Sequence, residues 1–168
     1  AHHNIWFTDD TNAELDALRS GRLFDSPTVY VCDPRDDLMR PPASASWRIA
    51  APVARHDPRH GVDWDAAAQA YATHVVDQLA TRGHDTRPHA IWQGLLSPAD
   101  YGRMSGSGDG AVGGPAYNGI ASAFARPQRG QLAGVYYVGS GAHPGPGIPL
   151  AGMGARTVAG MVPASQVP

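Results

Sequence analysis

The stretch that most constrains the fold of this chain lies between residues 132 and 162, where glycines and prolines separate two apolar segments. Val135–Val138 has the length and the β-branched and aromatic content of a buried strand. A loop follows it, with glycines at positions 139, 141, 145 and 147. Pro149 suits the first position of a helix, because that position needs no N–H donor. We therefore predict a strand, a glycine loop and a helix over 150–162, which Pro163 ends.

A helix that begins after such a loop directs free backbone N–H groups and a partial positive charge toward whatever covers the loop. The spacing Gly139-x-Gly141-x-x-Pro144 lacks the third glycine of the dinucleotide-binding fingerprint. No acidic residue follows the helix to hold a ribose, because the last one in the chain is Asp109. Spacing alone therefore supports a loop that binds a flat or anionic ligand and a plain glycine-rich turn about equally.

The same segment, VYYVGSGAHPGPGIPLAGMGARTVAG, resembles the C-terminal flavin motif of the phytoene desaturase family of carotenoid-pathway enzymes. The family pattern is a strand ending in Val-Gly, a small residue, Gly, Thr or Ala, His-Pro-Gly, and then small-Gly-Ile/Val-Pro before a helix of small residues. The match is nearly complete from Val138 to Pro149. Upstream, the segments that resemble the family are 2–37, 95–101 and 117–128. The likeness therefore covers essentially the whole chain.

The resemblance implies FAD as cofactor and a lipophilic polyene as substrate, which loses a hydride from an allylic C–H bond to the flavin and then a proton. It implies that the N–H groups of Gly147 and Ile148, beside Pro149, stabilise negative charge on the reduced ring. It also implies that Gly139 and Ser140 contact the ribityl or pyrophosphate region. These five residues are the predicted cofactor-binding residues.

His143 is the only titratable side chain between Val138 and Pro149. It is therefore the one weak candidate for a catalytic residue, as a lining of the substrate channel or a proton relay. The alternative is a structural loop histidine held by a backbone carbonyl, and isolated histidines favour that interpretation.

Members of the resembled family begin with a βαβ unit that carries G-x-G-x-x-G, and no such unit is predicted in these 168 residues. We therefore expect the C-terminal part of a larger enzyme, whose N-terminal half is the missing partner. Two alternatives stay open. One is another flavin amine-oxidase-like oxidoreductase, of the retinol saturase or carotenoid oxidase type. The other is an inactive truncated fragment.

Composition excludes some classes of function. The net charge of −2 gives no electrostatic case for binding nucleic acid, and the absence of lysine excludes lysine chemistry. The single cysteine, Cys32, cannot form an internal disulfide, which favours the cytoplasm. No run reaches the roughly 18 apolar residues of a membrane span, although a lipophilic substrate leaves peripheral contact with the inner face of the cell membrane open. No metal is expected, because Pro58 interrupts the pair His56 and His60.

The remaining elements are predicted from hydrophobic periodicity and capping signals. Predicted strands cover 3–8, 28–33, 47–53 and 89–96, and predicted helices cover 12–20 and 64–82, with a further helix starting at Ser97. Asp63 is the predicted N-cap of the long helix, and its apolar stripe is expected at Trp64, Ala68, Tyr71, Val75 and Leu79. Thr11 and Glu14 suggest a capping box, with Leu15 and Leu18 on the buried face of the first helix. The least ordered segment is expected over 104–119.

These elements predict an α+β fold as part of a two-domain α/β flavoprotein. A mixed or antiparallel substrate-domain sheet carries a long helix, and a strand, glycine loop and helix return to the FAD-binding domain. We expect residues 1–96 in the substrate domain, 97–129 in a connecting segment near the flavin, and 130–168 in the FAD-binding domain.

Overall fold

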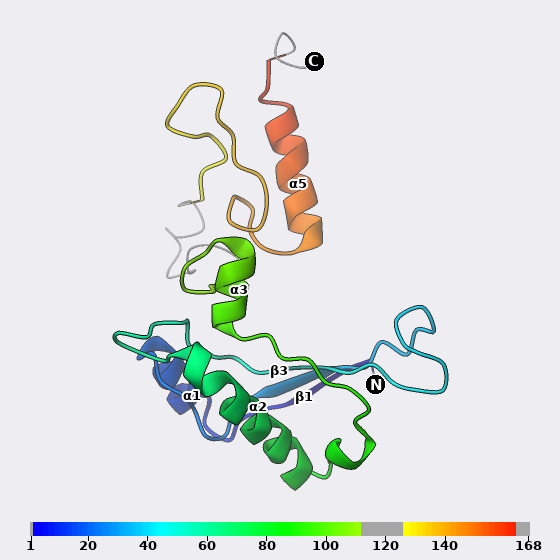
Figure 1. Cartoon of the computed structure of the whole chain (residues 1–168). Coiled ribbons are helices and arrows are strands. Elements are labelled where there is room, and N and C mark those ends of the chain that lie inside the picture. Colours follow the sequence, from blue (N-terminus) through cyan, green and yellow to red (C-terminus); the bar gives the residue numbers. More distant parts are fainter. Residues whose placement is uncertain (1, 112–125, 164–168) are drawn as a thin grey trace. The chain divides into compact units, whose positions relative to one another are not determined.

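A computed structural model describes residues 2–111 and 126–163 of the chain (Figure 1). The chain divides into two compact units, 1–111 and 112–168, and each is described by itself. The first unit holds a small antiparallel sheet with helices, and the described part of the second holds a loop-rich segment and one helix. The architecture is therefore mixed helix and sheet, as expected. No helix among the described residues is long and apolar enough to cross a membrane.

The sheet of the first unit has three strands in the order β1-β2-β3, with both pairings antiparallel. Their bounds are β1 His3–Trp6, β2 Val29–Cys32 and β3 Arg48–Ala50. Each lies inside a range predicted from the sequence. Val29 and Val31 of the central strand are fully buried, whereas Tyr30 and Cys32, which alternate with them, are only partly buried. One face of the sheet therefore carries the core and the other is more open.

Helix α2, Trp64–Thr81, supplies the other half of this core. The Asp63 side chain caps it by accepting a hydrogen bond from the Asp65 N–H, as predicted. Its buried residues are Trp64, Tyr71, Val75 and Leu79, at spacings of seven, four and four, and Ala68, between the first two, is partly buried against the core. The predicted apolar stripe is therefore the packed face of the helix.

Two aromatic side chains of α2 carry polar groups into the core, and both groups are satisfied. The Trp64 indole Nε1–H donates to the Ala54 carbonyl at 2.8 Å, and the Tyr71 hydroxyl donates to the Phe24 carbonyl at 2.8 Å. Burial raises the pKa of Tyr71, so this phenol stays protonated and keeps its donor role. These bonds tie α2 to the loop before β2 and to the loop after β3.

Helix α1, Thr11–Arg19, corrects the predicted capping box. The N-cap is Asp10, whose side chain accepts from the Ala13 N–H. Glu14 is buried instead and accepts from both the N–H and the hydroxyl of Thr28, at 2.7 and 2.8 Å. Leu15 is exposed, because Glu14 and Ala17 occupy the buried face. A buried carboxylate with two donors thus replaces the expected apolar contact.

The predicted strand over 89–96 is wrong. A short 3₁₀ helix, Arg87–His89, precedes a stretch without strand or helix. Ile91 and Trp92 are 91% and 84% exposed. The apolar composition of the segment gives the strand signal, but no strand of the described sheet pairs with it. An apolar run becomes a strand only where a neighbour accepts its backbone hydrogen bonds.

Helix α3, Pro98–Ser105, begins as the sequence predicts. The Ser97 hydroxyl accepts from the Asp100 N–H, and the Asp100 carboxylate accepts from the Ser97 N–H at 2.8 Å, which forms a reciprocal capping box. Pro98 occupies the first turn, and Gly106 ends the helix with a positive φ of 75°. Beyond Ala111, the predicted loop over 104–119 lies outside the described residues.

This capping box makes the start of α3 sensitive to acid. Hydrogen bonds from the Ser97 N–H, then from its hydroxyl, and then from the Arg103 guanidinium lower the pKa of Asp100 to about 2. A lowered carboxyl pKa contributes stability that is present above the unfolded value of about 3.9 and is lost as the pH falls through the folded value. We expect an NMR titration to give Asp100 a midpoint near 2 and α3 amides to lose protection between about pH 4 and pH 2.

Asp100→Asn should remove the pH dependence of amide protection in α3, whereas Asp9→Asn, at an exposed site, should leave that pH dependence unchanged. A midpoint for Asp100 near 3.9 in the folded chain would contradict the prediction.

In the second unit, the described elements are helix α5, Ile148–Ala159, and an irregular segment before it. The predicted strand over 135–138 is wrong. Only one isolated antiparallel bridge, between Arg129 and Tyr136, forms there, and Val135, Tyr137 and Val138 are exposed. Gly130 and Tyr137 donate backbone bonds that close a turn, to Val135 and Gln128 respectively. The aromatic and β-branched residues therefore form one side of a short hairpin-like turn rather than a buried strand.

Candidate functional site

The glycine loop and the start of α5 bring the five predicted cofactor-binding residues onto one short segment. Gly147 is the N-cap, with a φ of 107° that an L side chain rarely adopts, and no side chain caps the helix there. Ile148 is the first helical residue and is 90% exposed. Because the first N–H groups of a helix have no carbonyl one turn earlier, the Ile148 N–H can serve an external acceptor. Pro149 follows in the first turn, as predicted, although it takes the second helical position.

The loop before α5 is open on the side of its glycines. Gly139 has a φ of 120°, and a Cβ added at Gly139 or at Gly147 would meet no atom within 4 Å. The Gly139 carbonyl accepts from the Ala142 N–H at 3.1 Å, which closes a turn around Ser140. Ala142 is buried beneath it. A ligand could therefore approach the main chain at both glycines without displacing a side chain of the described unit.

Arg126 fixes this turn from the buried side. Its side chain is 3% exposed and donates to the Ser140 carbonyl at 2.8 Å. Its own carbonyl accepts from the His143 N–H at 3.2 Å. Sequence analysis missed Arg126 as a positioning residue, because its partners lie 14 and 17 residues away and no spacing rule links them. The adjacent Pro127 gave only a turn signal.

Gln128 and Gly154 hold α5 against the same turn. The Gln128 side-chain amide donates to the His143 carbonyl at 2.8 Å and to the Gly154 carbonyl at 3.4 Å. A Cβ added at Gly154 would lie 2.9 Å from the His143 carbonyl oxygen and 3.3 Å from the Pro144 ring. Close helix approach therefore requires glycine at 154. At Gly152 a Cβ would meet nothing within 4 Å, so close packing of the helix explains the glycine at 154 and not the one at 152.

His143 enters this arrangement through its main chain. Its N–H donates to the Arg126 carbonyl, and its own carbonyl accepts from the Gln128 amide and packs against Gly154. The His143 side chain is exposed. These contacts are those of a structural loop residue, and a catalytic role of the imidazole stays a prediction.

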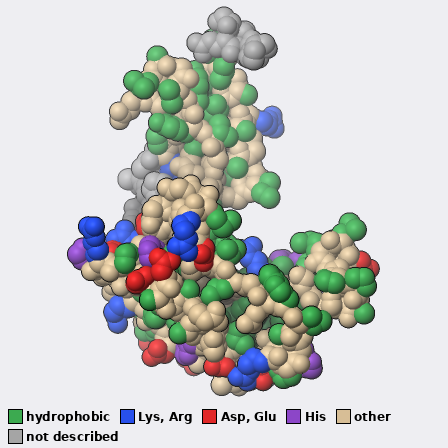
Figure 2. Space-filling model, viewed as in Figure 1, with side chains coloured by type: hydrophobic (Ala, Val, Ile, Leu, Met, Phe, Trp, Pro, Cys, Tyr) green, Lys and Arg blue, Asp and Glu red, His purple; other side chains and the backbone are tan. Residues whose placement is uncertain are grey.

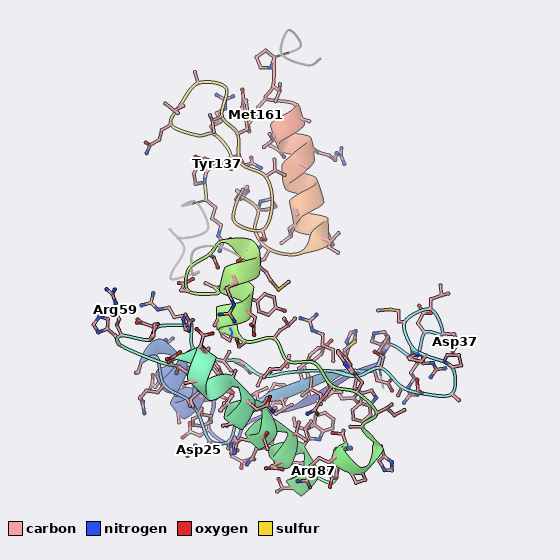
Figure 3. All side chains as sticks on the ribbon, in the orientation of Figure 1. Asp25, Asp37, Arg59, Arg87, Tyr137 and Met161 are labelled. Atoms are coloured by element: carbon pink, nitrogen blue, oxygen red, sulfur yellow. The ribbon has the colours of Figure 1, made fainter. Side chains whose placement is uncertain are left out.

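The charge of the second unit suits an anionic ligand. Residues 112–168 contain three arginines and no aspartate or glutamate. Figure 2 shows hydrophobic side chains and no acidic one on the visible face of this unit, which holds the yellow-to-red segment of Figure 1. Tyr137, labelled in Figure 3, lies on the hairpin-like turn and is half exposed. Free backbone donors, positive charge and exposed apolar groups fit part of a flavin nucleotide, with a phosphate or ring edge on the donors.

Two groups of metal-ligating side chains occur among the described residues, and both lie in the first unit. One consists of His2, His3 and Cys32, and the other of His56, Asp63 and Asp65. His60, which the sequence paired with His56, belongs to neither group. The expectation that no metal binds stays a prediction.

Comparison with known proteins identifies relatives along most of the chain. No family model matches it. A hydroxyneurosporene desaturase of Rhodobacter capsulatus is 32% identical over 155 residues, which is 90% of this chain and 30% of that protein. A hydroxyneurosporene desaturase of Cereibacter sphaeroides is 26% identical over 94% of this chain and 32% of that protein. A 4,4'-diapophytoene desaturase (4,4'-diaponeurosporene-forming) of Staphylococcus aureus is 26% identical over 88% of this chain and 31% of that protein. The chain thus spans about a third of the length of these relatives.

Proposed function

We propose that this chain, as a member of the carotenoid desaturase family in the region that it covers, is the flavin-facing C-terminal part of an FAD-dependent oxidoreductase. The proposed reaction is desaturation of a carotenoid precursor, in carotenoid biosynthesis. The observation that carries this proposal is the similarity to desaturases along about nine-tenths of the chain. The open glycine loop before an uncapped helix supports it independently.

In the proposed enzyme, the bound flavin supplies the oxidising chemistry by accepting a hydride from a C–H bond of the substrate. The residues of this chain bind and orient. The Gly147 and Ile148 N–H groups donate to an acceptor on the nucleotide, and the start of α5 favours negative charge there. Gly139 and Ser140 bring the main chain close to the ligand, and Arg126 holds the Ser140 carbonyl in place.

The segment offers one side of a nucleotide site. The G-x-G-x-x-G spacing occurs in its sequence only at Gly108, Gly110 and Gly113, after helix α3 and not after a strand, and the relatives are about three times as long. We therefore propose that residues for the ADP half of FAD lie in sequence outside these 168 residues. A lipophilic polyene substrate and peripheral contact with a membrane belong to the same proposal.

The test is whether flavin is retained. The chain alone, incubated with FAD and desalted, is expected to be colourless, because half of the site is missing. A chimaera of this chain with the preceding two-thirds of the Rhodobacter capsulatus relative is expected to keep the flavin absorbance bands. Gly147→Val in that chimaera should abolish retention, because valine disfavours a positive φ and covers the helix start. The matched variant Gly152→Val, on the open side of α5, should retain flavin.

A folded but colourless chimaera would contradict the flavoenzyme assignment and favour an inactive fragment. Equal retention in both glycine variants would overturn the assignment of the loop. With flavin retained, conversion of a polyene substrate distinguishes a desaturase from an oxidase or saturase of the wider flavoenzyme group.

A further inference from the structure

The register of β1 and β2 places a histidine directly opposite the only cysteine. His3 is the Cα partner of Cys32, and the Asp33 N–H donates to the His2 carbonyl at 2.8 Å. In an antiparallel ladder, hydrogen-bonded pairs alternate with pairs that are not hydrogen-bonded. His2 and Asp33 form the first kind, so His3 and Cys32 form the second, in which side chains lie closest. Both side chains point to the open face of the sheet, away from Val31 and the core.

His2 completes a cluster of three ligands. The His2 and His3 ring centroids are 4.4 Å apart, and one ligand atom from each of His2, His3 and Cys32 lies within 4.8 Å of the others. The two imidazoles are exposed and Cys32 is partly buried. Bonds of about 2.0–2.3 Å to one tetrahedral ion need ligand atoms about 3.3–3.8 Å apart. Rotation of the exposed imidazoles that moves their nitrogens by about 1–1.5 Å therefore brings the three ligand atoms to bonding distance of one ion.

Tyr30 orients one of these ligands. Its hydroxyl lies 2.7 Å from the His3 Nδ1, which leaves the other ring nitrogen for an ion. A hydrogen bond that fixes the ring of a ligating histidine is the usual outer-shell device of metal sites.

Against the expectation from the sequence that no metal binds, we propose that His2, His3 and Cys32 form a Zn²⁺ site on the open face of the sheet. Two imidazoles and one thiolate are a donor set that suits Zn²⁺, and three protein ligands leave a fourth position for water or another ligand. On binding, the Cys32 S–H bond breaks, the sulfur bonds the metal, and the proton leaves to solvent. The cluster lies in the first unit, and the inference does not rest on the proposed flavin site.

The other group of ligating residues is a weaker candidate, because its side chains already cap helix α2 and form an ion pair with Arg103. The His56 Nδ1 accepts from the Trp64 N–H, the Asp63 carboxylate accepts from the Asp65 N–H, and the Asp65 carboxylate pairs with Arg103 at 2.7 Å. An ion there would have to break a helix cap and an ion pair. A metal bound by His2, His3 and Cys32 would break no helix cap and no backbone hydrogen bond between β1 and β2.

Cobalt is the probe, because Co²⁺ occupies zinc sites and a cysteine thiolate gives it a charge-transfer absorbance. The reduced, untagged 168-residue chain is titrated with Co²⁺ and then with Zn²⁺. We expect a charge-transfer band that saturates at one equivalent and that Zn²⁺ removes, with release of a proton measured in weak buffer. Absence of the band from the folded chain would overturn the proposal.

Variants separate the cluster from a lone thiol. Cys32→Ser should abolish the band, and His3→Ala should weaken Co²⁺ binding by at least about tenfold. Tyr30→Phe should weaken binding by about 10–100-fold, as expected for an outer-shell partner. His89→Ala, an exposed histidine outside the cluster, should bind Co²⁺ like the parent. Circular dichroism checks that each variant is folded. Equal binding by the parent and by His2→Ala/His3→Ala would show that Cys32 acts alone and would overturn the site.

Discussion

Leu79→Ala is expected to lower the free energy of unfolding of this chain by about 2–5 kcal/mol, which is the range for truncation of a buried leucine. Leu79 is fully buried in α2 and belongs to the cluster that includes Val29 and Val31 of the sheet. The loss combines the transfer free energy of the removed atoms with the cavity left between helix and sheet. Because small domains are stable by only about 5–15 kcal/mol, the variant should be largely unfolded at moderate urea.

The matched control is Leu38→Ala, which removes the same atoms from a side chain that is 95% exposed. Its free energy of unfolding should stay within about 0.5 kcal/mol of the parent. Urea denaturation followed by tryptophan fluorescence gives both values, since Trp64 lies in the same core. Equal midpoints for the two variants would mean that α2 does not pack on the sheet as described.

Gly154→Ala and Gly152→Ala are expected to change the stability of the second unit in opposite directions. A Cβ at Gly154 would press on the His143 carbonyl and the Pro144 ring, and such overpacking typically costs about 1–3 kcal/mol. Replacing a glycine inside a helix with alanine stabilises the helix by about 1 kcal/mol, so the net loss of stability is up to about 2 kcal/mol. At Gly152 the added methyl group meets nothing within 4 Å, and only the gain remains.

Hydrogen exchange of the α5 amides, residues 148–159, measures both effects in the intact chain. Gly154→Ala should speed exchange by up to about thirtyfold, and Gly152→Ala should slow it by up to about fivefold, at about 1.4 kcal/mol per factor of ten. If both variants slowed exchange, α5 would not approach the loop at Gly154.

Periodicity and capping predicted the elements whose signals are local. The stripe of α2, the cap at Asp63 and the helix start at Ser97 each depend on residues within a few positions, and each is confirmed. The strands predicted over 89–96 and 135–138 are wrong, because composition marks an apolar run but does not supply a neighbour to pair with.

The contacts that the sequence could not predict join residues far apart along the chain. Glu14 leaves the predicted capping box because Thr28 offers it two donors, and Arg126 reaches Ser140 across 14 residues. The cluster of His3 and Cys32 depends on a strand register that no local pattern gives. The five predicted cofactor-binding residues do lie on one loop, since they are neighbours in sequence, but their binding of FAD stays a prediction.

Helix α5 is fastened to the preceding turn at its middle and just past its C-terminal end. Gln128 bonds Gly154 and the loop beneath it, while the Tyr136 hydroxyl donates to the Met161 carbonyl at 3.1 Å, just past the end of the helix (Met161 is labelled in Figure 3). The C-terminal half of the helix cannot unwind without releasing a partner on the turn. Residues 126–163 should therefore open as a single cooperative step, in which the turn and the helix lose their protection together.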